Sequence, residues 1–63
     1  MIGDKIKTLR KKRGLTRRKL SDAVGLTEAT IYMIEAGRES NPKLLTLDRI
    51  AAALGTTTAK LLR

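Results

Sequence analysis

The sequence predicts an all-α fold of five short helices, and three observations carry this prediction. Leu-Thr pairs at 15–16, 26–27 and 45–46 are each followed by an aliphatic residue five positions after the leucine. Each threonine can accept a bond from a free N–H of a first helical turn, and each leucine can pack on the aliphatic residue as a hydrophobic staple. A glycine follows the expected end of four helices, and no stretch alternates as a strand does.

Apolar residues at helical spacing place the helices and their buried sides. The expected helices cover residues 2–13, 17–24, 28–36, 47–54 and 58–62. The expected N-caps are Thr16, Thr27, Thr46 and Thr57. The expected core positions are Ile2, Ile6, Leu9, Leu20, Ala23, Val24, Ile31, Ile34, Leu47, Ile50, Ala51, Leu54, Leu61 and Leu62. Residues 38–45 form the one expected loop of any length, with Asn41-Pro42 as its turn signal.

Residues 15–37 read as two short helices joined by a tight turn at Gly25. A helix ends at that position, and glycine adopts the left-handed conformation needed there at low cost. Helix, glycine turn and helix is the layout of a helix-turn-helix, whose second helix can enter a groove of DNA.

The charge distribution favours a polyanionic partner. The 63-residue chain has 14 Lys and Arg against 6 Asp and Glu, a net charge of +8, and nine of the basic residues lie between Lys5 and Lys19. Double-stranded DNA, RNA and an acidic membrane surface all fit such a charge. The alternative is a solvated helix face that serves solubility.

Other function classes find little support in the composition. The chain has no cysteine and no histidine, which removes the commonest general base and the commonest metal ligands, and its acidic residues are scattered. We therefore expect no enzyme activity, no metal, no cofactor and no small-molecule substrate. No apolar run approaches the roughly 18 residues of a membrane span, so we expect a cytoplasmic protein without a membrane partner.

Two arginines stand where a helix does not favour them. Arg17 and Arg18 fall in the first turn of the second expected helix, next to its positive dipole end. A bound phosphate would reverse that local cost, because free N–H groups and two guanidinium groups would converge on it.

These features together resemble the Cro/cI-type helix-turn-helix family, with its lambda repressor-like fold. The matching stretches are IKTLRKKRGLT at 6–16, L-x4-GLT across the turn, I-x2-IE-x-G at the end of the third helix, and NPKLLTLDRIAAALG at 41–55. The resemblance covers nearly the whole chain and implies one compact five-helix bundle over residues 1–63. It also implies a homodimer on a near-palindromic DNA operator, with the last helix and the loop before it as the dimer surface.

The resemblance assigns phosphate contacts to the start of the second helix and to the loop before the fourth helix. The expected phosphate contacts are Arg10, Arg17, Arg18, Thr30, Arg38, Asn41 and Lys43. The family often carries glutamine where this chain has Arg17, so the change should raise affinity more than selectivity. The resemblance also pairs Arg10 with Glu35 as a structural salt bridge, and the alternative is an exposed pair of little value.

The third helix is expected to read bases in the major groove. Its expected base contacts are Thr27, Glu28, Ala29, Tyr32 and Met33. Glu28 can accept a bond from cytosine N4, and Ala29 and Met33 can contact thymine methyl groups. The helix carries no Arg, Lys, Asn or Gln, so its residues are also compatible with a surface that has no DNA target. A second hypothesis is therefore a designed or protein-interaction module on this fold, with Tyr32 and Met33 as its contact patch.

Overall fold

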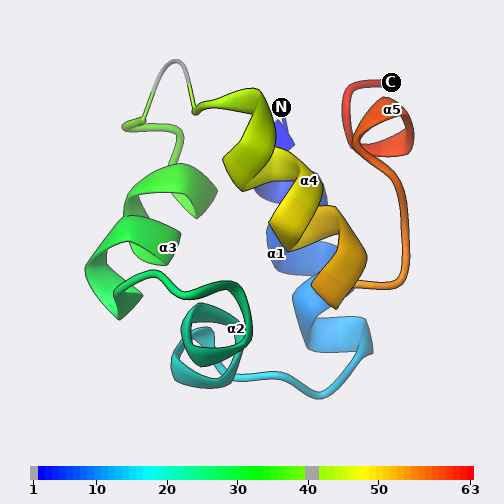
Figure 1. Cartoon of the computed structure of the whole chain (residues 1–63). Coiled ribbons are helices and arrows are strands. Elements are labelled where there is room, and N and C mark those ends of the chain that lie inside the picture. Colours follow the sequence, from blue (N-terminus) through cyan, green and yellow to red (C-terminus); the bar gives the residue numbers. More distant parts are fainter. Residues whose placement is uncertain (1, 40–41) are drawn as a thin grey trace.

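The computed structural model describes residues 2–39 and 42–63, and its regular elements there are all helical. The helices are α1 (Ile2–Lys12), α2 (Arg17–Val24), α3 (Glu28–Glu35), α4 (Leu44–Ala53) and α5 (Thr58–Leu61) (Figure 1). The predicted all-α fold of five helices is therefore confirmed. Three of the predicted helices extend one residue too far at their C-terminal ends, and the fourth was misplaced at both ends.

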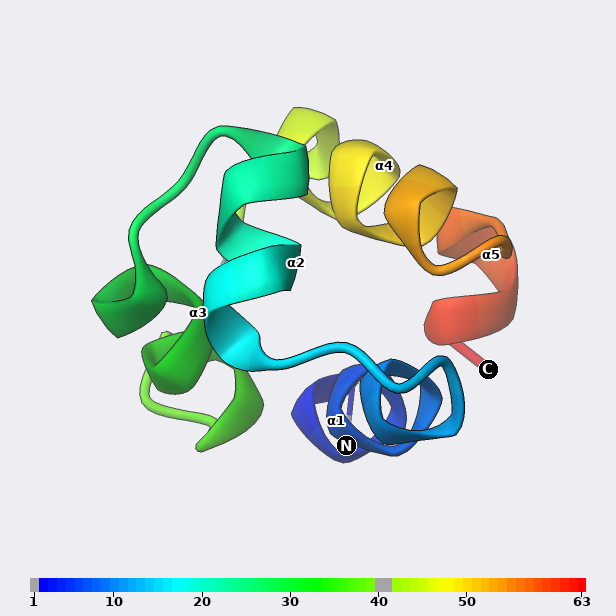
Figure 2. The same ribbon diagram turned by 90° about the horizontal axis from the view of Figure 1, so that it is seen from below.

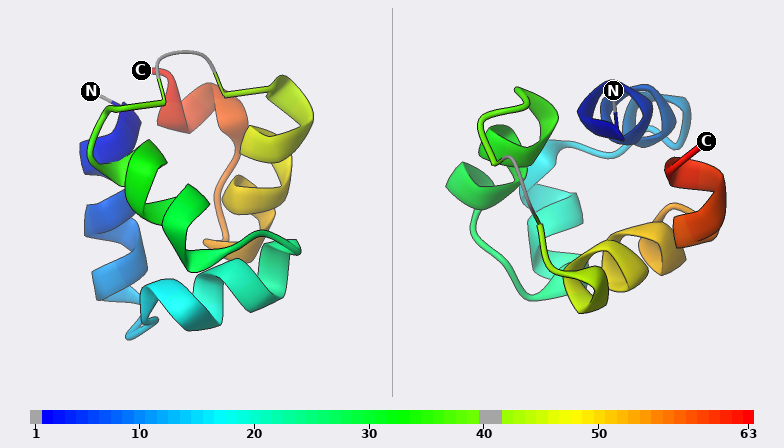
Figure 3. Two further views of the ribbon diagram at one scale, coloured as in Figure 1. Left: turned by 90° about the vertical axis from the view of Figure 1, so that its left-hand side faces the viewer. Right: turned by 90° about the horizontal axis from the view of Figure 1, so that it is seen from above.

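The helices surround one apolar centre. The pair α2 and α3 packs closely, α4 lies against the other side of α2, and α1 lies against α3 (Figure 2). Helix α5 contacts both α4 and α1 and so closes the ring on the side away from α3 (Figure 3). The chain thereby leaves the outer surfaces of α2 and α3 uncovered by any other described helix.

The core matches the predicted apolar positions with two exceptions. The buried hydrophobic residues are Ile6, Leu20, Val24, Ile31, Ile34, Leu47, Ile50, Ala51, Leu54 and Leu61, and Ile2 and Leu9 pack half-buried against them. The predictions for Ala23 and Leu62 were wrong, since both are exposed. Leu20 and Val24, four residues apart, already form the inner line of α2, which leaves Ala23 on its flank. Leu62 follows the last turn of α5 and points outward, while Leu61 occupies the core.

Three of the four predicted threonine caps are present. Thr16, Thr27 and Thr57 have extended backbones, and each side chain accepts a bond from the N–H three residues later. Leu15 and Leu26, which precede two of these caps, pack half-buried against the core, as staples require.

The fourth predicted cap was wrong, because α4 begins at Leu44 and Thr46 lies inside it. The first helical bond runs from the Leu47 N–H to the Lys43 carbonyl at 3.0 Å, so Lys43 is the N-cap residue, without a side-chain bond. Leu45, the predicted staple, is 62% exposed. The Leu-Thr spacing does not distinguish a cap from a helix interior, because Thr46 and Ile50 are four residues apart and also share a helical face.

Candidate nucleic-acid interface

The turn between α2 and α3 is fixed by backbone bonds and one buried hydroxyl. Gly25 has φ +75° and donates to the Ser21 carbonyl, which also accepts from the Leu26 N–H at 2.9 Å. The Ser21 hydroxyl is buried and donates to the Arg18 carbonyl at 2.8 Å. Sequence reasoning missed Ser21, because a serine directly before an aspartate in a basic helix looks like a surface residue. These bonds set the angle between the two helices.

The side of α3 that faces away from the core is exposed along its length. Thr27, Glu28 and Ala29 are exposed, Tyr32 is 43% exposed and Met33 is 39% exposed. The five predicted base contacts thus lie on one uncovered surface. We call these five residues the outer face of α3.

Thr30 lies at the edge of this surface and is half-buried. Its hydroxyl is 2.9 Å from the Thr27 hydroxyl, which also accepts from the Thr30 N–H at 3.1 Å. The two threonines therefore complete the cap of α3 together, which restricts the Thr30 hydroxyl as a phosphate ligand.

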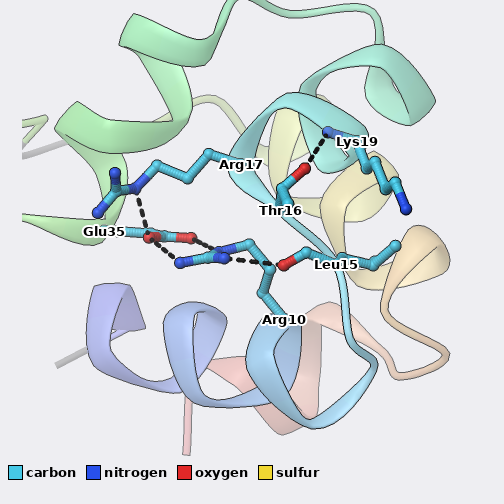
Figure 4. A network of polar contacts seen from close by, with 6 residues as sticks. All are labelled: Arg10, Leu15, Thr16, Arg17, Lys19 and Glu35. Carbon is cyan, nitrogen blue, oxygen red and sulfur yellow. Dashed lines mark hydrogen bonds and ion pairs between the residues drawn. The ribbon is translucent and has the colours of Figure 1, made fainter.

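Arg10 and Glu35 form a buried pair between α1 and α3. Arg10 Nε donates to Glu35 Oε2 at 2.7 Å and Arg10 Nη2 donates to Oε1 at 3.2 Å, with the two side chains 8% and 2% exposed (Figure 4). The remaining nitrogen, Nη1, donates to the Leu15 carbonyl at 2.8 Å. The expectation that Arg10 binds phosphate was therefore wrong, because its guanidinium is buried and bonded within the protein.

Arg17 is less free than its position in the sequence suggested. Its Nε donates to Glu35 Oε1 at 3.3 Å (Figure 4). Its guanidinium carbon lies 5.2 Å from the centroid of the Tyr32 ring. The side chain nevertheless remains 40% exposed. Sequence reasoning missed both contacts, since they depend on how α2 packs on α3.

The other predicted phosphate ligands flank the outer face of α3. Arg18 is exposed in the first turn of α2, and Arg38 is exposed directly after α3. Lys43 is exposed at the start of α4. Asn41 lies outside the described residues. Exposed cations thus stand at the α2 N-terminus, directly after α3 and at the start of α4.

The part of the chain that the structure describes lacks two other kinds of site. Between residues 2 and 39 and between 42 and 63, no three acidic side chains gather in a way that could hold a metal ion. In the same two ranges, no helix combines the length and the apolar character needed to cross a membrane.

The fold and the α2–α3 pair define a helix-turn-helix protein, and comparison with known families agrees. A family model described as Helix-turn-helix matches residues 6–61. The chain therefore belongs to this helix-turn-helix family, the one that the sequence motifs resembled.

The relatives are described as transcriptional regulators or repressors. An uncharacterized HTH-type transcriptional regulator of Methanothermobacter thermautotrophicus is 48% identical over 50 residues, which is 79% of this chain and 71% of the relative. The HTH-type transcriptional regulator SinR of Bacillus subtilis is 31% identical over 98% of this chain and 56% of SinR. The immunity repressor protein of Bacillus phage phi105 is 41% identical over 86% of this chain and 37% of that protein. The chain thus spans little more than half the length of SinR.

Solved structures of SinR share the fold closely. The structure of SinR in complex with DNA superposes with a TM-score of 0.94 at 30% identity, covering 100% of both chains. The N-terminal DNA-binding domain of SinR from Bacillus subtilis also gives 0.94 at 30% identity, covering 100% of this chain and 91% of that one. The arrangement of five helices is therefore shared with a chain solved on DNA.

Proposed function

We propose that this chain binds double-stranded DNA as the DNA-binding unit of a repressor-like transcriptional regulator. The observation that carries the proposal is the uncovered outer face of α3, with exposed cations at the start of α2 and between α3 and α4. Family membership and the likeness to SinR solved with DNA support it. Because the relatives named above are regulators by description, we propose a binding role and no catalytic one.

In this proposal the two groups of residues have different tasks. Arg17, Arg18, Arg38 and Lys43 bind phosphates and supply affinity that does not depend on sequence. We also propose Asn41 and Thr30 as phosphate ligands. Thr30 would bind through the hydrogen-bonding capacity of its hydroxyl that the contact with Thr27 does not use. The outer face of α3 enters the major groove, where Glu28 accepts from cytosine N4 and Ala29 and Met33 meet thymine methyl groups.

One copy of the chain is too small to read a full operator. The described residues extend 24 × 22 × 18 Å, whereas successive half-sites on one side of the duplex lie about 34 Å apart. We therefore propose a homodimer on a near-palindromic operator, formed through α5 and the segment before it. Leu62, an apolar side chain that is 62% exposed next to α5, suits such a contact.

A salt titration followed by an operator selection tests the proposal. On a random duplex, we expect log affinity to fall linearly with log salt, by about 0.9 for each phosphate contacted. Selection from a randomised duplex library should then return near-palindromes with half-sites roughly 10 base pairs apart. Equal binding to every sequence would remove specific readout. No binding at low salt would refute DNA binding and favour the alternative, a protein contact through exposed Tyr32 and Met33.

A further inference from the structure

Two side chains from α3 orient the guanidinium of Arg17. Glu35 Oε1 accepts from Arg17 Nε at 3.3 Å, and the Tyr32 ring lies 5.2 Å from the guanidinium carbon. Tyr32 and Glu35 are three residues apart, so they are neighbours one turn apart where the exposed and buried sides of α3 meet. Arg17 itself is the first residue of α2. Its side chain therefore bridges the two helices of the helix-turn-helix.

Glu35 is a fixed support for this arginine. Its carboxylate is 2% exposed and is held by Arg10 through bonds of 2.7 and 3.2 Å. Arg10 already balances the charge of Glu35, so the three side chains together keep a net charge of +1. That charge belongs to Arg17, which is 40% exposed, whereas Arg10 is buried.

The same contacts leave part of the Arg17 guanidinium available. Glu35 accepts from Nε, and the two terminal nitrogens extend past the carboxylate, away from Arg10 (Figure 4). An unsupported arginine loses much rotamer freedom when it binds phosphate. An arginine that is already oriented loses less, and its planar fork suits a phosphate bidentately.

We propose that Tyr32 is a positioning residue, whose ring and the Glu35 carboxylate together hold Arg17 in the orientation that binds a duplex phosphate at the start of α2. The inference rests on the proposed DNA binding and changes the role of one residue in it. Tyr32 acts on affinity through Arg17 and does not read a base. Base selection then falls to Glu28, Ala29 and Met33.

The role of Tyr32 depends on its ring, which Tyr32→Phe keeps and Tyr32→Leu removes. A cation–ring contact at an exposed site corresponds to about two- to fivefold in affinity. We expect Tyr32→Leu to weaken binding by that factor for every duplex in a panel of unrelated sequences. Tyr32→Phe should restore the affinity. Arg17→Ala should weaken binding further and reduce the salt slope by about 0.9, while the charge-matched Arg49→Ala, exposed on α4, should do neither.

A double-mutant cycle decides whether Tyr32 acts through Arg17. In the Arg17→Ala background, Tyr32→Leu should change affinity by less than about 1.5-fold, because the group that it positions is gone. If the two losses multiply, the side chains act independently and the inference is wrong. A loss by Tyr32→Leu confined to duplexes that share one base pair would also overturn it, since Tyr32 would then read that base.

The protein without DNA separates failure of this inference from failure of the proposed function. We expect the NMR signals of the Arg17 Hδ protons to be shifted upfield by the Tyr32 ring, and this shift to vanish in Tyr32→Leu and persist in Tyr32→Phe. An upfield shift in a protein that binds no duplex would refute DNA binding while leaving the contact intact. Duplex binding without that shift would overturn the positioning role alone.

Discussion

The two sides of α3 differ in what holds them and in what they leave free. On the inner side, Ile31, Ile34 and Glu35 are at most 5% exposed, and Glu35 is bonded to both α1 and α2. On the outer side, Tyr32 and Met33 are about 40% exposed, at 43% and 39%. The inner side of this eight-residue helix thus fixes its position in the fold, and the outer side stays available for contacts with another molecule.

The polar contact on the inner side depends on direction, which an apolar contact does not. Arg10 donates to two oxygens of Glu35 and to the Leu15 carbonyl, so one guanidinium joins α1, the segment before α2, and α3. Hydrogen bonds of this kind depend on direction, whereas apolar packing tolerates sliding. The pair therefore sets the register of α3 and, with it, the direction of the outer face.

The largest expected effect is the loss of Glu35. Glu35→Ala would leave the buried Arg10 without its partner, and breaking a buried pair in this way costs about 3–5 kcal/mol. For a domain of this size, such a loss is a large part of the free energy of unfolding. Urea denaturation followed by circular dichroism measures it.

The matched control for that experiment is Glu39→Ala. Glu39 is an exposed acid four residues further along the chain, so its loss should change stability by less than about 0.5 kcal/mol. If the two variants unfold at the same urea concentration, the Arg10–Glu35 pair contributes no stability and the division between the sides of α3 fails.

A second variant tests how closely the inner side is packed. A Cβ added at Gly3 in α1 would lie 2.4 Å from the Ile34 carbonyl oxygen and 2.7 Å from that of Glu35. Backbone atoms cannot swing aside as a flexible side chain can, so Gly3→Ala should push α1 from α3 and cost about 1–3 kcal/mol. The thermal midpoint of unfolding should fall accordingly. An unchanged midpoint would mean that the approach of the two helices is loose.

A third variant concerns the outer side and should change base preference more than stability. Glu28 is exposed at the start of α3, where the interaction of its charge with the helix dipole stabilises the helix by about 0.3–1 kcal/mol. Glu28→Gln removes that charge at similar size. We expect it to change preference at one base pair by about 1–3 kcal/mol, measured by repeating the operator selection. If the selected sequences do not change, Glu28 reads no base and contributes only to the stability of the helix.

The division between the two sides also explains how far the sequence could be interpreted. Helical spacing predicted the inner residues Ile31 and Ile34, because burial leaves a periodic apolar pattern. The two contacts of Arg17 left no such pattern, since Glu35 and Tyr32 lie 18 and 15 residues away along the chain and meet it only through packing. The roles of the outer residues stay predictions, because exposure by itself identifies no base.

Helix starts also show how far a local sequence pattern can predict the structure. Leu15-Thr16 and Leu26-Thr27 open helices, whereas the same spacing at Leu45-Thr46 lies within α4. What differs is the segment before the threonine, since the extended Lys43 already precedes Leu44 and its carbonyl accepts the first helical bond, from the Leu47 N–H. Motif spacing is therefore informative only together with what precedes it.

The smallest expected effects compare these threonines directly. Thr27→Ala removes the side chain that accepts from the Thr30 N–H at 3.1 Å, and loss of such a cap costs about 1 kcal/mol. Thr46→Ala replaces a threonine inside a helix by the better helix former, so stability should stay the same or rise by a few tenths of a kcal/mol. Both variants remove the same atoms, so urea denaturation compares their free energies of unfolding directly. Equal losses would mean that the Thr46 hydroxyl also stabilises a helix start, and that the beginning of α4 differs in solution from the one described. A loss at Thr27 alone would show that capping, and not the leucine–threonine spacing, stabilises the helix that carries the outer face.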